Sequence, residues 1–517
     1  MGSASDHSEK QERPPGYTFN EVHVDTAAQL AAGSDEPLDP DVAARIRRKI
    51  DFRLMPLMCI SPEFGPPTIS CWEMDEVCLH SARLYDHLTT DLVHPSINIF
   101  IWAIALLAHA ACKSFGGLFA VRFILGACEG AITPGFMIVT SMFYTRQEQT
   151  RRVGYWFLMN GFAVIFLGFL AFGVLHTKVG PLFLSSRFSK LNSTCQFPIS
   201  DTRLHAMEMT ADRLSHRLMI ITGIITLVIA VLFWFWFPDS PTTASFLTPE
   251  ERILAVKRIQ VNQTGVENKH WKREQFIETL KDPKVWVMAL FSMVSNLINS
   301  LINQRQLIVN QFGFTVIQTT LIGCVDGVVE IITIWLGVVL ATTKPVGRGY
   351  AGILMFIPAL LGCLLVNLLP SHMKIGLLFS YWLSIFGIAP SPIFLGWVST
   401  LTSGHTKRIT TNAIVLISYA IGNIAGPFVW KEQYKPRNHV PWTLLAVSVG
   451  VSALLLWALR AMLAMENKRR DSENRDETYD NVYITHINAD GTTEEKKVDK
   501  AFLDLTDIQN RDFRYVL

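Results

Sequence analysis

Four charged residues lie inside long apolar stretches of this sequence, and they are the first candidates for chemistry. Glu129 follows Arg122 by seven residues, so both side chains lie on one face of a helix with 3.6 residues per turn. Asp326 and Glu330 are four residues apart and share a face in the same way. A charge inside a membrane helix is costly and usually faces a bundle interior for a functional reason. We therefore expect an ion or proton pathway; structural ion pairs and helix ends near the lipid headgroups are the alternatives.

The same apolar stretches contain amide side chains that could line such a pathway. An amide can hydrogen-bond a carboxylate or ureide ligand, but it can also link neighbouring membrane helices, and linking is the commoner role. The candidates are Asn160, Asn296, Asn299, Asn412 and Asn423.

Ten apolar stretches must position these side chains. Each is about 20 residues long, which is the length that a helix needs to cross a bilayer. The stretches are 96–112, 117–143, 153–176, 218–237, 285–304, 316–341, 350–369, 375–398, 409–430 and 441–464. The sequence therefore predicts an all-α integral membrane protein in contact with the lipid bilayer.

The composition supports this class and excludes others. Hydrophobic residues make up 50% of the 517 residues and charged residues only 17%, against about 25% in soluble proteins. The net charge of +2 gives no reason to expect a nucleic-acid partner. The eight cysteines follow no disulfide or metal spacing, and the sequence has no phosphate-binding loop or nucleophile elbow. We therefore expect no enzyme, no ATP-driven pump and no cofactor.

A polar stretch near the middle divides the apolar stretches into two groups. Clusters of Lys and Arg after the second, sixth, eighth and tenth stretches place these ends in the cytosol. In the polar stretch, Thr248, Pro249 and Glu251 predict the capped start of a helix, which is either an amphipathic helix lying under the bundle or a solvated linker helix. Asn192 begins an Asn-Ser-Thr sequon, a weak glycosylation signal in a loop expected outside. The expected domains are a cytosolic tail (1–53), an incomplete N-terminal bundle (54–237), a cytosolic middle loop (238–284), a C-terminal bundle (285–464) and a cytosolic tail (465–517).

Several motifs resemble those of one transporter family. They are RFILGACEGAITP at 122–134, FPDSP at 237–241, FLTPE at 246–250, GHTKR at 404–408, GNIAGP at 422–427, and DLTD with NRDFR at 504–514. Together they resemble the major facilitator superfamily, more narrowly its anion:cation symporters, and within these the fungal allantoate permease family.

The resemblance implies a fold of twelve helices in two bundles, with transport by alternating access. It implies a small organic anion as substrate, protons as the coupling ion and a plasma-membrane location. It also implies that Arg122 belongs to the anion pathway and Glu129 to proton coupling, and that Glu330 lies in helix eight, which lines the C-terminal half of the cavity.

The sequence departs from this family in two places. Helices one and two should occupy about 54–95, but this region contains no apolar run of the required length, and the loop at 177–216 is longer than the family pattern. An imperfect gene model would explain both departures, and so would a degenerate transporter. The alternative functions are therefore an exporter of a fungal secondary metabolite and a non-transporting membrane protein.

Overall fold

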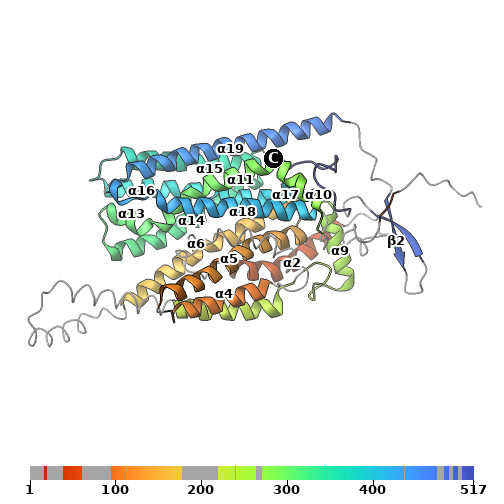
Figure 1. The fold of residues 1–517 in the computed structure, drawn as a ribbon, viewed down its shortest axis with the longest axis horizontal. Helices are drawn as coiled ribbons and strands as arrows, with labels where there is room; N and C mark the ends of the chain where they lie inside the picture. Colours follow the sequence, from red (N-terminus) through yellow and green to blue (C-terminus); the bar gives the residue numbers. More distant parts are fainter. Residues whose placement is uncertain are drawn as a thin grey trace, which may run out of the picture.

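The protein is a bundle of long helices arranged in two groups (Figure 1). The computed structural model describes residues 17–19, 39–60, 95–112, 114–176, 219–238, 240–262, 271–343, 345–435, 437–473, 482–487, 493–498 and 503–517. Asn192 and most of the region expected to hold helices one and two therefore lie outside the described residues.

The N-terminal bundle forms the lower layer in Figure 1. Its helices are α2 (Pro40–Ile60), α4 (Pro95–His109), α5 (Phe115–Phe143), α6 (Arg146–His176) and the span Met219–Trp236. In its core, Phe136, Phe233 and Phe237 stack on one another, and Trp156 meets Phe136 edge to face. These aromatic side chains join three of its helices, so the predicted N-terminal apolar stretches pack as one unit.

The C-terminal bundle forms the upper layer. Its elements are α11 (Pro283–Ser295), η2 (Asn296–Asn299), α12 (Ser300–Asn303), α13 (Arg305–Gln311), α14 (Val316–Thr342), α15 (Gly347–Leu368), α16 (Lys374–Ser384), η3 (Ile385–Ile388), α17 (Pro390–Leu401), α18 (His405–Phe428), η4 (Glu432–Tyr434) and α19 (His439–Asp471). The predicted boundary at residue 464 therefore falls inside α19.

The elements outside the two bundles lie together near one end of the molecule (Figure 1). They are α9 (Pro249–Gln260), α10 (Arg273–Lys281), β1 (Tyr17–Phe19), β2 (Val482–Ile487) and β3 (Thr493–Val498). The strands form a small sheet in which β2 pairs with β1 in parallel and with β3 in antiparallel register.

The prediction of an all-α integral membrane protein is confirmed. Among the described residues, eight helices are long and apolar enough to cross a bilayer, and two shorter apolar helices cover Ser96–His109 and Phe115–Cys128. Large apolar side chains such as Trp335, Leu361 and Trp457 are exposed on the outer faces of these helices. Exposed apolar surface on this scale fits contact with lipid.

Two predicted spans are broken midway, whereas the sequence indicated continuous helices over 285–304 and 375–398. In the first, α11 gives way to η2, where the Asn296 side chain donates to the Ser292 carbonyl and competes with the backbone ladder. In the second, α16 gives way to η3 just before Pro390, which has no backbone donor and clashes with the preceding turn. The two 3₁₀ turns contact each other.

The first described helix begins well before the predicted first apolar stretch. In α2, the buried residues Ile46, Ile50, Leu54 and Met58 recur every four positions and form one apolar face. α2 packs against α6, where the Arg152 guanidinium lies 2.6 Å from a carboxylate oxygen of Asp51.

The predicted capped helix of the middle loop is confirmed. The Thr248 side chain accepts from the Glu251 backbone N–H, and the Glu251 carboxylate accepts from the Thr248 backbone N–H. Val256 and Ile259 are buried, so α9 packs against the bundle rather than standing free in solvent.

The two bundles meet most closely where α6 crosses α14. A Cβ atom built on Gly161 would lie 2.6 Å from the Gly327 carbonyl oxygen, and one built on Gly327 would lie 2.6 Å from the Gly161 carbonyl oxygen. Small residues let helix backbones approach in this way.

Replacing Gly327 by alanine is expected to destabilise the protein by about 1–3 kcal/mol, because the added methyl group meets backbone that has no flexible side chain to move. Gly450 in α19 is the matched control, since a Cβ built there meets nothing within 4 Å. Alanine at Gly450 should be neutral or stabilising by up to about 1 kcal/mol. Thermal unfolding in detergent compares the two, and equal midpoints would contradict the close contact.

Candidate functional site

Two buried carboxylates form the centre of the candidate site. Asp326 and Glu330 lie on α14 with only 6% and 2% of their surface exposed. The Asn160 side-chain amide on α6 donates to the Glu330 carboxylate. The Trp382 indole N–H donates to Asp326 at 2.8 Å, and the Tyr381 hydroxyl donates to it at 3.4 Å. The site therefore combines groups from α6, α14 and α16, and it spans both bundles.

One cation that acts on these carboxylates is Arg305. It begins α13, and its guanidinium lies against α14, because a Cβ built on Gly323 would be 2.9 Å from the Arg305 Cζ atom. Arg305 acts electrostatically on both Asp326 and Glu330. A guanidinium has a planar donor fork that matches a carboxylate. We call Asn160, Arg305, Asp326 and Glu330 the polar cluster.

Sequence reasoning missed Arg305, because it directly follows the predicted stretch 285–304 and so looked like the polar end of a helix. The available signal was weak: Asn296, Asn299 and Asn303 precede it in the same segment. Several amides within one apolar stretch suggest that its helix lines a polar pathway inside the bundle. The next charged residue along the chain is then a candidate for the same pathway.

Three of the predicted amides bond to one another instead of facing the polar cluster. The Asn299 amide nitrogen lies 3.0 Å from the side-chain oxygens of both Asn296 and Asn423. These bonds join η2 to α18 inside the C-terminal bundle, which is a helix-linking geometry. Asn412 is buried on α18.

The remaining predicted residues lie on α5. The Arg122 guanidinium donates to the His109 ring of α4 at 3.3 Å, within the N-terminal bundle. Glu129 lies in α5, but its side chain is outside the described residues. Of the predicted residues, the structure thus places Asn160, Asp326 and Glu330 in the polar cluster, and it groups Asn296, Asn299 and Asn423 separately.

A cavity of about 320 Å³ lies elsewhere, between α6 and α14. Arg151, Tyr155, Trp335 and Thr343 are among its lining residues, and all four are exposed. None of the polar cluster lines this cavity, so we assign it to the outer surface and not to the candidate site. Among the described residues, no group of His, Cys, Asp or Glu side chains is arranged to hold a metal ion.

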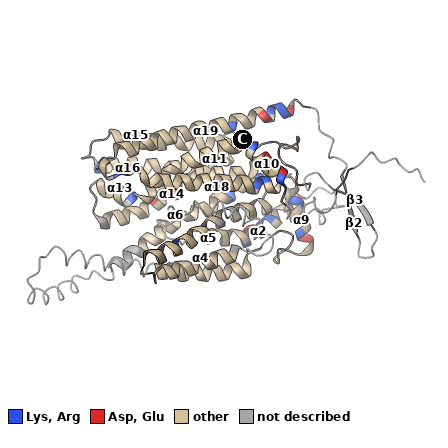
Figure 2. Cartoon of the chain, in the orientation of Figure 1, with Lys and Arg blue, Asp and Glu red and all other residues tan. Residues whose placement is uncertain are grey.

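Charged residues gather at the end of the molecule where α9 and α10 lie (Figure 2). We call it the charged end; the C-terminal ends of α5 and α17 and the N-terminal ends of α6, α15 and α18 also lie there. At this end the two bundles are hydrogen-bonded to each other.

The bonds of this contact involve six residues, which we call the seam. Arg408 donates to the Ser141 hydroxyl at 3.0 Å, and the Ser399 hydroxyl donates to the Gln149 amide oxygen at 3.1 Å. The Arg348 guanidinium donates to the Arg146 backbone carbonyl. Because most of these groups are buried, the seam closes the charged end.

The family model of the Major Facilitator Superfamily matches residues 96–427. The thiamine pathway transporter THI73 of Saccharomyces cerevisiae is 31% identical over 81% of this chain and 71% of its own length. The allantoate permease of the same yeast is 29% identical over 96% of this chain and 90% of its own length.

The solved structures give the same fold. The proton:xylose symporter XylE is 11% identical, with a TM-score of 0.54 over 84% of this chain and 92% of the symporter. At this identity the likeness concerns the fold alone.

Proposed function

The chain belongs to the major facilitator superfamily, and on that basis we propose that it is a proton-coupled transporter of a small organic anion, working by alternating access. The family consists of transporters and not of enzymes, and the protein is a multi-pass membrane protein. Its relatives are transporters of small organic substrates. The anion, the protons and a plasma-membrane location are the parts that we propose.

The polar cluster is the observation that carries the proposal. Arg305 supplies the positive charge for a substrate carboxylate, and two carboxylates lie within its electrostatic reach. When Glu330 or Asp326 binds a proton, Arg305 has one fewer anionic neighbour, so it attracts a substrate anion more strongly. Proton and anion would therefore bind together and leave together.

The two bundles supply the movement. The seam closes the charged end, so the described conformation is one of the two states that alternating access requires. The contact between Gly161 and Gly327 lies along the same interface and is a suitable pivot. Arg122 and Glu129, on α5, remain our candidates for the N-terminal side of the pathway.

The relatives suggest which anions to try first. Allantoate carries one carboxylate and several amide-like ureide groups, so Arg305 could bind the former and Asn160 could bond the latter. Cysteine, the substrate in the name of another relative, is a smaller zwitterion that offers the same carboxylate without net charge, so it tests whether a net anion is required.

Uptake by yeast cells that express the protein tests this function. Radiolabelled allantoate, nicotinate, pantothenate and cysteine would be offered at several external pH values. We expect uptake of at least one anion that rises as the external pH falls and that a protonophore abolishes. Efflux alone, from preloaded vesicles, would favour an exporter, and no flux in either direction would favour a non-transporting protein.

Glutamine at Glu330, and separately at Glu129, is expected to abolish acid-driven uptake while substrate exchange persists, because an amide cannot carry the coupling proton. Glu250, exposed on α9, is the matched control, and its change to glutamine should leave the pH profile unchanged. An unaltered pH profile in both variants would mean that neither carboxylate carries the coupling proton.

A further inference from the structure

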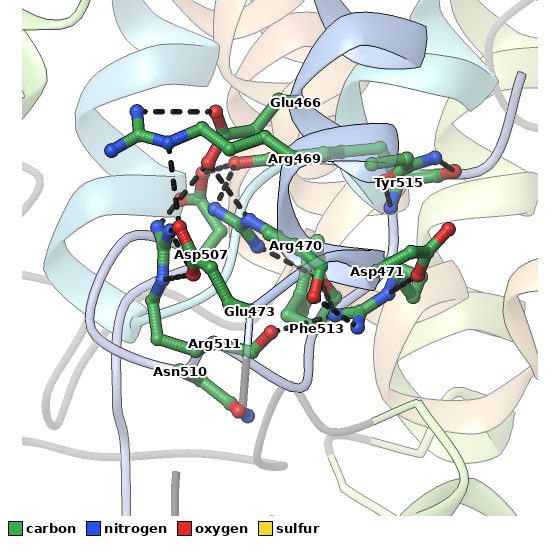
Figure 3. A network of polar contacts seen from close by, with 12 residues as sticks. Glu466, Arg469, Arg470, Asp471, Glu473, Asp507, Asn510, Arg511, Phe513 and Tyr515 are labelled. Carbon is green, nitrogen blue, oxygen red and sulfur yellow. Dashed lines mark hydrogen bonds and ion pairs between the residues drawn. The ribbon is translucent and has the colours of Figure 1, made fainter. Parts of the chain in front are cut away.

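The segment 503–517 lies against the charged end and contacts both bundles. Figure 3 shows its side chains facing those at the end of α19. Arg511 pairs with Glu473, and the Arg514 guanidinium lies 2.7 Å from the Asp471 carboxylate. This segment contains the DLTD and NRDFR motifs at 504–514, and none of their residues belongs to the polar cluster.

On the C-terminal bundle the segment is anchored by a buried ion cluster. The Asp507 carboxylate lies 2.7 Å from the Lys284 amine, 2.9 Å from the Lys407 amine and 2.6 Å from the Tyr515 hydroxyl. Burial alone would raise the pKa of Asp507, but the two lysines outweigh it and hold that pKa well below its usual range. Asp507 therefore stays ionised, and separating it from the lysines would leave buried charges unpaired.

Backbone contacts add to this anchor. The Trp397 indole donates to the Val516 carbonyl at 2.7 Å, and the Arg348 backbone N–H donates to the Leu517 carbonyl at 3.1 Å. The Arg470 guanidinium donates to the Phe513 carbonyl at 2.7 Å. α15, α17 and α19 thus each hold the segment.

On the N-terminal bundle, as far as the structure describes it, the segment is bonded to Arg146 of the seam. The Arg146 guanidinium lies over the Phe513 ring, 3.9 Å from its centroid, and donates to the Arg514 carbonyl at 3.3 Å. Two other nitrogens of this guanidinium, Nε and Nη2, are buried without a hydrogen-bond partner among the described residues. The hold on this side is therefore much weaker than the ion cluster on the other.

We propose that segment 503–517 is a latch that stabilises the closed charged end and releases Arg146 when that end opens. The inference rests on the proposed alternating access. Because the two holds are unequal, the latch stays on the C-terminal bundle and parts from the N-terminal one. It would thereby set how often the charged end opens.

Thiol labelling tests the latch without any substrate. A reporter cysteine replaces Ser399, which is buried in the seam, in a protein whose eight native cysteines are replaced by alanine or serine. A small maleimide is added to the protein in lipid nanodiscs. Its reaction rate measures the population of molecules with an open charged end, since a closed seam shields the thiol.

The Phe513→Leu change keeps the apolar volume but removes the aromatic face, and it is expected to speed labelling about fivefold. Arg146→Gln should have a similar effect. The double variant should label no faster than the faster single one, because both changes remove one contact.

Phe356→Leu is the matched control, since Phe356 packs against Phe291 inside the C-terminal bundle. Labelling that is unchanged in both latch variants, or that rises equally in the Phe356 control, would overturn the latch. Since the readout needs no substrate, a protein that fails every uptake assay can still support or overturn this proposal.

Discussion

Replacing Arg305 by alanine is expected to lower the ratio kcat/KM of uptake at least about 100-fold, a transition-state loss of about 2.7 kcal/mol or more. The change removes the cation that acts electrostatically on Asp326 and Glu330, and it leaves these buried carboxylates with less compensation. Lysine at this position keeps the charge but not the donor fork, so it should recover only part of the rate.

Two further variants separate a loss of binding from a loss of folding. Arg273, exposed at the start of α10, is the matched control, and alanine there should leave uptake intact. Combining Arg305→Ala with Asp326→Asn should restore part of the thermal stability, because one of the two less compensated charges is gone, without restoring uptake. Arg305→Ala that transports like the control would remove Arg305 from the substrate site.

Replacing Asp507 by alanine is expected to destabilise the protein by about 3–5 kcal/mol, the cost of breaking a buried ion pair by removing one partner. Lys407, with none of its side chain exposed, and Lys284 would both lose this carboxylate partner and keep Asp282. Thermal unfolding in detergent measures the change.

The pH dependence of this loss has a definite sign. The pKa of Asp507 is lower in the folded protein than its usual value of about 3.9, so its stabilisation is fully present above that value and fades as the pH falls below it. The deficit of the variant should therefore be constant between about pH 5 and about pH 8. The exposed pair of Asp471 and Arg514 supplies the control, and Asp471→Asn should change little. Equal deficits in the two variants would contradict the buried cluster.

Local patterns predicted much of the fold. Runs of apolar residues located the spans, because hydropathy is set by the residues of each run alone. The capping pattern at Thr248 and Glu251 likewise predicted the start of α9, since both partners lie within one turn. The paired spacing of Asp326 and Glu330 correctly put them on one buried face of α14.

The sequence patterns did not predict contacts between segments that are far apart in the chain. Asn160 and Glu330 are 170 residues apart, and nothing local to either indicates that they are bonded. Arg305 comes near enough to act on Glu330 because α13 packs against α14. The segment around Asp507 looked like a solvated tail, because its partners Lys284 and Lys407 lie on other helices.

The broken spans make the two bundles mechanically unequal. α5 and α6 run unbroken for 29 and 31 residues. When one end of such a helix moves, we expect the other end to move with it. The spans interrupted at η2 and η3 change there to 3₁₀ hydrogen bonds, whose geometry is poorer, so these spans bend more easily at the two turns. We therefore expect bending during turnover at η2 and η3, while α5 and α6 tilt without bending.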